Sequence, residues 1–331
     1  MEVLRGVHQI KIPFPEGISR ETNIYVLEGT RGNIVVDSGW DCQESLWAFQ
    51  ESMRANFLKL QDIKQIVITH MHPDHYGLAS KIKQLCGAKI AMHKLEAGFI
   101  LPRYKDYVDL IKKTEAELRQ NGVPKEELPQ LKEASLWMKK YVIPDVPEVL
   151  LEDGDTISNG SFELEVIWTP GHSPGHICLY EPDRKFILTG DHVLYDTTPH
   201  IGVNPQSSNN PLGDYVSSLQ RLARLKVSFA LPGHGPVFNA LGLRIDKILQ
   251  HHEQRKNAIM KALRSGPKTA YEIAGQIPWM TDEGGAPFEN LGVWDRRMAI
   301  TETIAHLRLL IEEDRVGNIE MEGASTYLSK E

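Results

Sequence analysis

The sequence predicts a mixed α/β (α+β) fold in which two sheets are sandwiched between helices. Two observations predict it. Strand-like runs alternate with helical runs over about residues 1–240. In addition, several apolar strand-like runs end at a glycine that is followed by a histidine or an aspartate. Loops that leave strands in this way converge on one edge of a sheet, so the pattern also predicts a cleft with chemistry in it.

The expected elements follow in chain order. Residues 23–36 predict two short strands joined near residues 29–32, and residues 45–58 have helical spacing. A helix over 78–86 is expected to end at Gly87, and residues 89–92 predict the next strand. Residues 149–190 predict four short strands separated by turn residues, and residues 215–225 predict another helix.

The most informative run lies directly after an apolar strand-like segment and contains His70, His72, Asp74 and His75. The first two are two positions apart, so they point the same way on extended backbone. The last two follow the turn at Pro73 and can face a second position. Imidazole nitrogen suits zinc, iron and similar metals, and carboxylate oxygen suits harder ions. This run therefore predicts half of a two-metal site.

Three later residues qualify for the other half of such a site: His172, Asp191 and His234. Each comes at the end of an apolar, β-rich run and beside glycine. A single histidine after a strand usually has a structural role. Because several strand ends carry ligand-type residues together, we expect them to meet in one cleft.

These motifs resemble the metallo-β-lactamase-fold hydrolases. The resemblance rests on His-x-His-x-Asp-His at 70–75, Thr-Pro-Gly-His-Ser-Pro-Gly-His at 169–176, Gly-Asp-His at 190–192 and Pro-Gly-His-Gly at 232–235. An early strand that ends at Asp37 also matches. The matches come in the family's order and cover about residues 1–240, and they are far more specific for fold and metal site than for substrate. The fold that they imply is a four-layer αβ/βα sandwich.

The resemblance also implies how two metal ions are held. One ion would be bound by His70, His72 and His172, and the other by Asp74, His75 and His234, with Asp191 bridging both. Water between two cations becomes a hydroxide nucleophile near neutral pH, and Asp74 can orient it and shuttle its proton. Zinc is the ion that we expect first, with manganese or iron as alternatives, because the same ligand set accepts each.

Four further residues have expected supporting roles near this site. In similar proteins the position of Asp37 accepts a hydrogen bond that fixes a ligand imidazole. His176 and His192 are ambiguous, and for His176 a supporting or packing role is expected ahead of ligation. Tyr195, four positions after the bridging aspartate, could donate to a substrate carbonyl or oxyanion, although a structural hydroxyl is equally open.

Two segments lie outside the minimal fold. Within a catalytic domain over 1–243, the insertion at 98–147 predicts two amphipathic helices, over 104–120 and 125–141. They form either a hairpin packed for stability or a cap whose apolar side receives a substrate tail. Residues 244–331 predict three helices, over 244–263, 269–276 and 296–311, and then a β-hairpin over 316–328. That order indicates a winged-helix-like domain and resembles the subgroup typified by lactamase-β-like protein 2.

Composition and charge limit the partners. The chain has 331 residues and a net charge of −7, and residues 245–331 carry 11 Lys/Arg against 14 Asp/Glu. Because phosphate neutralisation dominates nucleic-acid affinity, this balance argues against nucleic acid as a partner. No apolar stretch approaches the ~20 residues of a membrane span, and the three widely spaced cysteines do not predict a disulfide framework. We therefore expect a cytoplasmic enzyme without a membrane partner. The oligomeric state is left open, with a homodimer as one alternative.

The function that these residues favour is metal-dependent hydrolysis of a thioester, ester or lactone in a small acyl substrate. The alternative is an endoribonuclease acting on single-stranded RNA, since the resembling subgroup includes an RNA-cleaving member type as well as fungal thioester hydrolases. That alternative predicts a basic strip leading to the metals. Two weaker alternatives remain: a persulfide dioxygenase, which shares the ligand set, and a binding module without chemistry. The binding module is disfavoured because every expected ligand position is filled.

Overall fold

The computed structural model describes residues 1–17, 20–281 and 284–331. Its contacts divide the chain into two compact units, each built from three segments. The first unit contains residues 1–106, 138–199 and 218–245, and the second contains 107–137, 200–217 and 246–331. Most of the expected insertion is thus grouped with the C-terminal segment. The domain boundary near residue 243 and the role of 98–147 as a cap remain predictions.

The first unit holds a seven-stranded sheet whose strands are neighbours in chain order. These strands are β1 Glu2–Leu4, β2 Val7–Pro13, β3 Glu21–Leu27, β4 Asn33–Val36, β5 Ile63–Ile68, β6 Lys89–His93 and β7 Val149–Leu151. The pairs from β1 to β4 are antiparallel, and those from β4 to β7 are parallel. The parallel part brings the carboxyl ends of β4 and β5 to one edge, where Asp37 and the run from His70 to His75 follow.

A second sheet of five strands has the order β12-β11-β10-β9-β8. Its strands are β8 Thr156–Ser158, β9 Glu163–Trp168, β10 Ile177–Glu181, β11 Phe186–Gly190 and β12 Phe229–Pro232. The strand β10 is antiparallel to both β9 and β11, and β12 is parallel to β11. The strands β9, β11 and β12 therefore end at the same edge, and the three later candidate ligands follow these ends.

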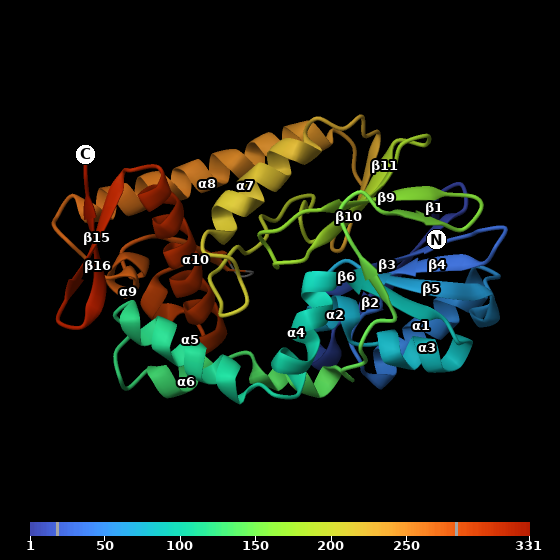
Figure 1. The fold of residues 1–331 in the computed structure, drawn as a ribbon, viewed down its shortest axis with the longest axis horizontal. Coiled ribbons are helices and arrows are strands. Elements are labelled where there is room, and N and C mark those ends of the chain that lie inside the picture. Colours follow the sequence, from blue (N-terminus) through green and yellow to red (C-terminus); the bar gives the residue numbers. More distant parts are fainter. Residues whose placement is uncertain (18–19, 282–283) are drawn as a thin grey trace. The chain divides into compact units, whose positions relative to one another are not determined.

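Helices cover the outer face of the seven-stranded sheet. They are α1 Gln43–Ala55, α2 Pro73–Tyr76, α3 Ala79–Cys86 and α4 Lys94–Tyr104, with 3-10 turns at Pro15–Gly17, Leu60–Asp62 and Leu136–Tyr141. Figure 1 shows α1 and α3 next to β4 and β5 of this sheet. As expected, α3 ends at Gly87, whose φ of 74° is left-handed.

Two apolar cores lie on opposite faces of this sheet. On β3, Ile24 and Val26 pack with Phe49 and Met53 of α1. The alternate residues of β3 pack in the second core, which also contains residues of β9, β10 and β11. Burial on both faces explains why these strands have nearly continuous apolar sequences. The predicted α/β sandwich of two sheets between helices is confirmed.

The second unit is mainly helical. Two of its helices extend into the first unit, where α7 ends and α8 begins. Its elements are α5 Val108–Gln120, α6 Leu128–Glu133, α7 Pro211–Leu222, α8 Leu241–Leu263, α9 Ala270–Ala274, β13 Trp279–Thr281, β14 Gly284–Ala286, a 3-10 turn Phe288–Asn290, α10 Val293–Glu312, β15 Val316–Met321 and β16 Ala324–Ser329. The predicted order of three helices and a hairpin is found in α8, α9, α10 and β15–β16. Lys268, between α8 and α9, also pairs with Tyr327 of β16, as a short first strand of a winged helix would. The winged-helix assignment itself remains a prediction.

Three local expectations were wrong. The helix expected over 125–141 is instead the short α6 followed by a 3-10 turn at Leu136–Tyr141. The helix expected from residue 104 starts at Val108, because Tyr104 ends α4 and its hydroxyl donates to the Met71 carbonyl at 2.5 Å. Residues 149–190 form five strands rather than four, because residues 149–151 pair with β6. Within the described part of the chain, no helix is long and apolar enough to cross a membrane.

Candidate metal centre

The seven predicted ligands come together in the first unit as two groups. One group is His70, His72 and His172, and the other is Asp74, His75, Asp191 and His234. In each group one nitrogen or oxygen atom per residue lies within 4.8 Å of the others. The strand ends of both sheets therefore converge as the sequence predicted. The role of these residues as ligands remains a prediction.

The histidine group is compact because of the turn that follows β5. His72 precedes α2 on extended backbone, and its carbonyl accepts hydrogen bonds from the amides of His75 and Tyr76 at 3.0 and 2.9 Å. The Nδ1 atom of His72 lies 2.9 Å from Nε2 of His70 and 3.1 Å from Nε2 of His172. Three imidazoles from two separate loops thus face one point.

Asp191 lies between the two groups. Its Oδ1 is 3.3 Å from Nε2 of His75, and its Oδ2 is 3.5 Å from Nε2 of His234 and 3.8 Å from Nε2 of His172. Asp74 completes the second group, with Oδ2 at 3.2 Å from Nε2 of His234. Asp191 is therefore in reach of both groups, as a bridging ligand must be.

The protonation of the imidazoles differs between the groups. Burial, together with the neighbouring histidines, holds the pKa values of His70 and His72 well below the usual range, so these rings are neutral. Burial would also lower the pKa of His75, but the carboxylates of Asp191, Asp37 and Asp74 outweigh it and raise that pKa well above the usual value. The pKa of His234 is raised to about 10, because Asp191 and Asp74 outweigh the effect of burial.

The donor set of this centre fits divalent metal ions. Neutral imidazole nitrogens and carboxylate oxygens are ligands for zinc, manganese and iron. Two buried atoms, Nε2 of His75 and Oδ1 of Asp191, face each other without a hydrogen-bond partner among the described residues. A divalent cation beside them would replace the proton that the raised pKa of His75 implies, and Nε2 of His75 would then be a ligand. The second group therefore has a reason to bind a cation that does not depend on family resemblance.

Asp37 holds one ligand from behind. Its Oδ2 is 2.8 Å from Nδ1 of His75, and its Oδ1 accepts a hydrogen bond from the Thr69 amide at 2.8 Å. The hydroxyl of Thr69 also lies 3.1 Å from Nδ1 of His70. With Nδ1 of His75 engaged in this way, Nε2 of the same ring is left to face the centre. These contacts are the arrangement expected of a residue that orients a metal ligand.

The two ambiguous histidines lie beside the centre without joining either group. His176 is buried and neutral, since burial holds its pKa well below the usual value. Its Nε2 accepts a hydrogen bond from the Asp191 amide at 3.2 Å, and its Nδ1 is 2.9 Å from the Thr169 hydroxyl. Burial lowers the pKa of His192 to about 3, and its ring lies 5.5 Å from that of His176. The contact to the Asp191 backbone gives His176 a supporting position.

Tyr195 lies on the loop that follows Asp191 and is half exposed. Its ring packs 5.7 Å from that of Phe238. A Cβ built on Gly235, next to His234, would lie 3.9 Å from the Tyr195 Cβ, so Tyr195 is adjacent to the loop that carries this ligand. Its expected role as a hydrogen-bond donor remains a prediction.

Sequence reasoning missed a buried acid near the centre, Glu96. Its carboxylate accepts hydrogen bonds from the amides of Met71 and Gly175, which lie on the two loops of the histidine group. A signal was present, because this acid interrupts the otherwise apolar run from Leu95 to Leu101 three residues after a strand. Nothing in the sequence indicated which loops it would reach.

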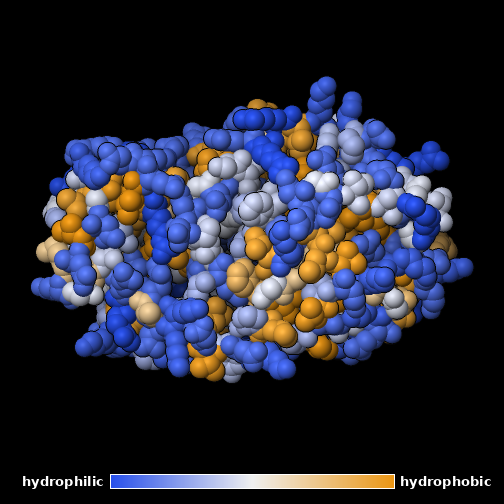
Figure 2. Space-filling model, in the orientation of Figure 1, coloured by the Kyte–Doolittle hydropathy of each residue, from blue (hydrophilic) through white to orange (hydrophobic). Residues whose placement is uncertain are grey.

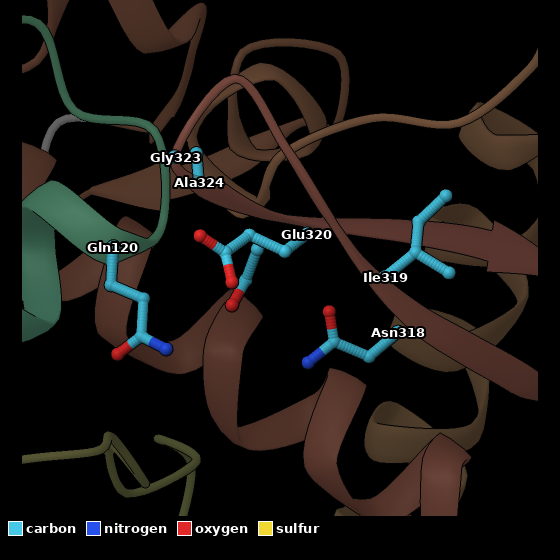
Figure 3. Close-up of a pocket in the computed structure, with 7 residues that line it drawn as sticks. Gln120, Asn318, Ile319, Glu320, Gly323 and Ala324 are labelled. Carbon is cyan, nitrogen blue, oxygen red and sulfur yellow. The ribbon is translucent and has the colours of Figure 1, made fainter.

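One open pocket of about 370 Å³ in the second unit contains none of the candidate ligands. It is lined by Gln120, Asn318, Ile319, Glu320, Gly323, Ala324 and Ser325. Figure 3 shows polar side chains of Gln120, Asn318 and Glu320 directed toward its interior. The lining residues offer hydrogen bonds but no histidine, and none of them belongs to a metal-type group, so the pocket does not compete with the centre as a metal site.

Comparison with known proteins agrees with this geometry. The Bacillus subtilis protein named Probable metallo-hydrolase YqjP is 26% identical over 325 residues, which cover 96% of both chains. The protein of Gallus gallus named Acyl-coenzyme A thioesterase MBLAC2 is 31% identical over 247 residues, which cover 71% of this chain and 79% of that one. Both names describe hydrolases.

A solved structure supports the same relationship. The metallo-beta-lactamase family protein TTHA1429 from Thermus thermophilus superposes with a TM-score of 0.83 at 28% identity, covering 99% of this chain and 100% of that one. Residues 19–234, which include every candidate ligand, match the family described as the Metallo-beta-lactamase superfamily. This chain therefore belongs to the metallo-β-lactamase superfamily of metal-binding hydrolases.

Proposed function

We propose that this protein is a binuclear metallo-hydrolase that cleaves small-molecule acyl thioesters. The observation that supports this most strongly is the position of Asp191, whose two carboxylate oxygens face imidazoles of both groups at 3.3–3.8 Å. The same centre could act on an ester or a lactone, because all three substrates present a carbonyl carbon to a nucleophile.

Two divalent ions bound here would supply Lewis acidity and lower the pKa of water at the centre. The protein residues would do the rest. The pKa of Asp191 is held well below its usual value, because His234 and His75 outweigh burial, so its carboxylate stays ionised and can bridge. Asp74 has Oδ2 at 3.2 Å from Nε2 of His234, and it would take up a proton from water at the centre. Tyr195 would donate its hydroxyl hydrogen to the substrate oxygen that gains charge.

The choice of a thioester is supported by relatives and by surface chemistry. Relatives from chicken and human that are named acyl-coenzyme A thioesterases are 31% and 30% identical to this chain. The face of the molecule in Figure 2 carries apolar patches, and exposed apolar side chains of the first unit include Leu95 and Leu101 on α4 and Leu150 on β7. Such side chains suit an acyl chain better than a polynucleotide, whose backbone requires basic residues.

The direct test is thiol release from acyl-coenzyme A thioesters of several chain lengths. Metal-loaded enzyme, chelator-stripped enzyme and reloaded enzyme are compared, with single-stranded RNA as a parallel substrate. We expect thiol release that disappears on stripping and returns on reloading. Equal release by stripped enzyme would contradict the metal mechanism. Cleavage of RNA without release of any thiol would contradict the proposed substrate class and favour the endoribonuclease.

A further inference from the structure

Glu96 is a fully buried acid that belongs to neither ligand group. It lies in the first turn of α4, and its side chain has 0% exposure. Carboxylates are rarely buried to this extent unless they are paired or hydrogen-bonded. The partners of this one indicate what it does.

Both oxygens of Glu96 accept hydrogen bonds from backbone amides of loops that carry histidine ligands. Oε2 accepts from the Met71 amide at 2.8 Å, and Met71 lies between His70 and His72. Oε1 accepts from the Gly175 amide at 2.7 Å, three residues after His172. A single carboxylate therefore joins the loop after β5 to the loop after β9, which belong to different sheets.

Two neighbouring residues, Gly175 and Tyr104, keep α4 close to both loops. A Cβ at position 175 would lie only 2.8 Å from Glu96 Cγ and from the Glu96 backbone nitrogen, so only glycine allows the loop to come this close. At the other end of α4, the Tyr104 hydroxyl donates to the Met71 carbonyl at 2.5 Å. The helix α4 thus holds the loop of His70 and His72 at two points, and through Glu96 it holds the loop of His172 as well.

We propose that Glu96 is a positioning residue that sets the spacing between His72 and His172 and so tunes the histidine group for its metal ion. The inference rests on the metal binding in the proposed function, but not on the identity of the substrate. The second group has a different support, because Asp37 holds His75 from behind at 2.8 Å. Loss of Glu96 should therefore weaken one of the two ions selectively.

The substitution Glu96→Gln changes the hydrogen bonds of this side chain with little change in its shape. Glutamine has the same shape, but one oxygen becomes an NH2 group, which cannot accept a hydrogen bond from either amide. The backbone amide of one of the two loops, itself a donor, then faces the NH2 donor of the glutamine. Substitutions behind metal ligands typically cost about 10–100-fold in metal affinity. We expect a loss of that size for the ion of the histidine group, with little change at the other site.

The test measures two dissociation constants by chelator competition, with cobalt absorption spectra reporting the ligand geometry. Glu96→Gln is compared with the wild type, with Glu44→Gln as an exposed control on α1, and with Asp37→Asn, which should weaken the other ion. We expect Glu96→Gln to weaken only the ion of the histidine group and Glu44→Gln to weaken neither ion. Asp37→Asn should weaken mainly the ion of the second group, because Asp37 contacts His75 directly but His70 only through Thr69. If Glu96→Gln binds both ions like the wild type, or loses both equally, the proposal is wrong.

A shorter carboxylate covers the case in which Glu96→Gln fails to fold. Glu96→Asp keeps the charge but cannot reach both amides, so it should show a smaller loss at the same site, and unchanged affinities would again contradict the proposal. Metal affinity is measured without substrate. Wild-type protein that binds two ions but releases no thiol would therefore contradict the thioester proposal while leaving the role of Glu96 intact.

Discussion

Each unit of this protein contains a cluster of buried and partly buried histidines and acids, and the two clusters differ in how many ligand-type atoms meet at one point. The strand-end cluster consists of the seven candidate ligands of the first unit, whose ligand atoms converge in two groups. The helix cluster of the second unit consists of His200, His252, Arg255, Glu302 and His306. Among the residues that the structure describes, none of these five is part of a metal-type group.

A chain of contacts connects the residues of the helix cluster. The Nδ1 atom of His306 lies 2.8 Å from the Glu302 carbonyl, and its Nε2 lies 3.1 Å from Nδ1 of His252. The Glu302 carboxylate lies 3.3 Å from Nε of Arg255 and 3.4 Å from Nδ1 of His200. One ring nitrogen of His252 and one of His306 thus face each other. The contacts of this cluster connect α8 with α10.

In the strand-end cluster two imidazoles are held from behind, as His306 is by the Glu302 carbonyl. His75 is held through Nδ1 by Asp37, and Nδ1 of His234 donates to the Glu21 carbonyl at 2.8 Å. Both rings therefore present Nε2 to the centre. The comparison shows that residue types alone do not make a metal site, since both clusters are rich in histidine and acid. The difference is convergence, because among the described residues three or more ligand atoms lie within 4.8 Å of one another only in the strand-end cluster.

The largest effect is expected from removing the residue that joins the two metal groups. Asp191→Ala should lower kcat on the order of 1,000-fold and reduce the bound metal below two ions per chain. It should also lower the free energy of unfolding, because His75 and His234 lose the carboxylate that raises their pKa values and because bound metal stabilises the folded state. Thiol release, metal analysis and urea unfolding check this, with Asp196→Ala on the same loop as an exposed control. Full activity of Asp191→Ala would exclude a bridging role.

The helix cluster should respond differently, with a loss of stability and no loss of metal. His306 is fully buried, so His306→Ala should lower the free energy of unfolding by about 2–4 kcal/mol through the cavity and the lost hydrogen bonds. Metal content should stay at the wild-type value. Urea unfolding and metal analysis test both statements, with the exposed Gln254→Ala on α8 as the control. Loss of metal from folded His306→Ala protein would mean that this cluster also serves an ion.

A pH dependence of stability should follow from the same residue. Burial, partly opposed by the Glu302 carboxylate, lowers the pKa of His306 from 6.5 to about 4. Between these values the unfolded chain takes up a proton that the folded chain does not, so stability falls as pH drops from 6.5 toward 4. The full loss is about 3 kcal/mol, and above pH 6.5 this residue contributes no slope.

Urea unfolding of the wild type and of His306→Gln at pH 7.5, 6 and 5 isolates this contribution from that of other acids. The variant should have a shallower dependence on pH than the wild type. Parallel curves for the two proteins would show that His306 is protonated at the same pH in the folded and unfolded states.

The smallest effect is expected at Tyr195. If its hydroxyl donates to the substrate oxygen, Tyr195→Phe should lower kcat about 10-fold and change KM little, because the hydrogen bond strengthens as charge develops. Steady-state kinetics on one thioester decides this. Unchanged kcat would remove Tyr195 from the mechanism.

The sequence predicted the strand-end cluster well because its signal is local. A strand, a glycine and a ligand such as Asp191 or His234 are adjacent in the chain, and a parallel sheet then brings such ends together. The fold could be predicted for the same reason, since alternation of apolar residues depends only on near neighbours.

The parts that could not be predicted depend on long-range contacts. Glu96 reaches Gly175, 79 residues away, and His252 meets His306, 54 residues away. The grouping of residues 107–137 with the C-terminal segment is also a tertiary property. Near residue 135 the chain changes from α6 to a 3-10 turn although its apolar spacing and its residue types favour a continued helix, so local preference does not decide the backbone there.

The most direct test of the central claim is an anomalous-scattering map from crystals of protein loaded with zinc or manganese. Two peaks are predicted, one among His70, His72 and His172 and one among Asp74, His75 and His234, with Asp191 within bonding distance of both. No peak should lie at the His252–His306 pair. A single peak in the strand-end cluster, or a peak in the helix cluster, would contradict the account of a two-metal centre built by convergence of the strand-end ligands.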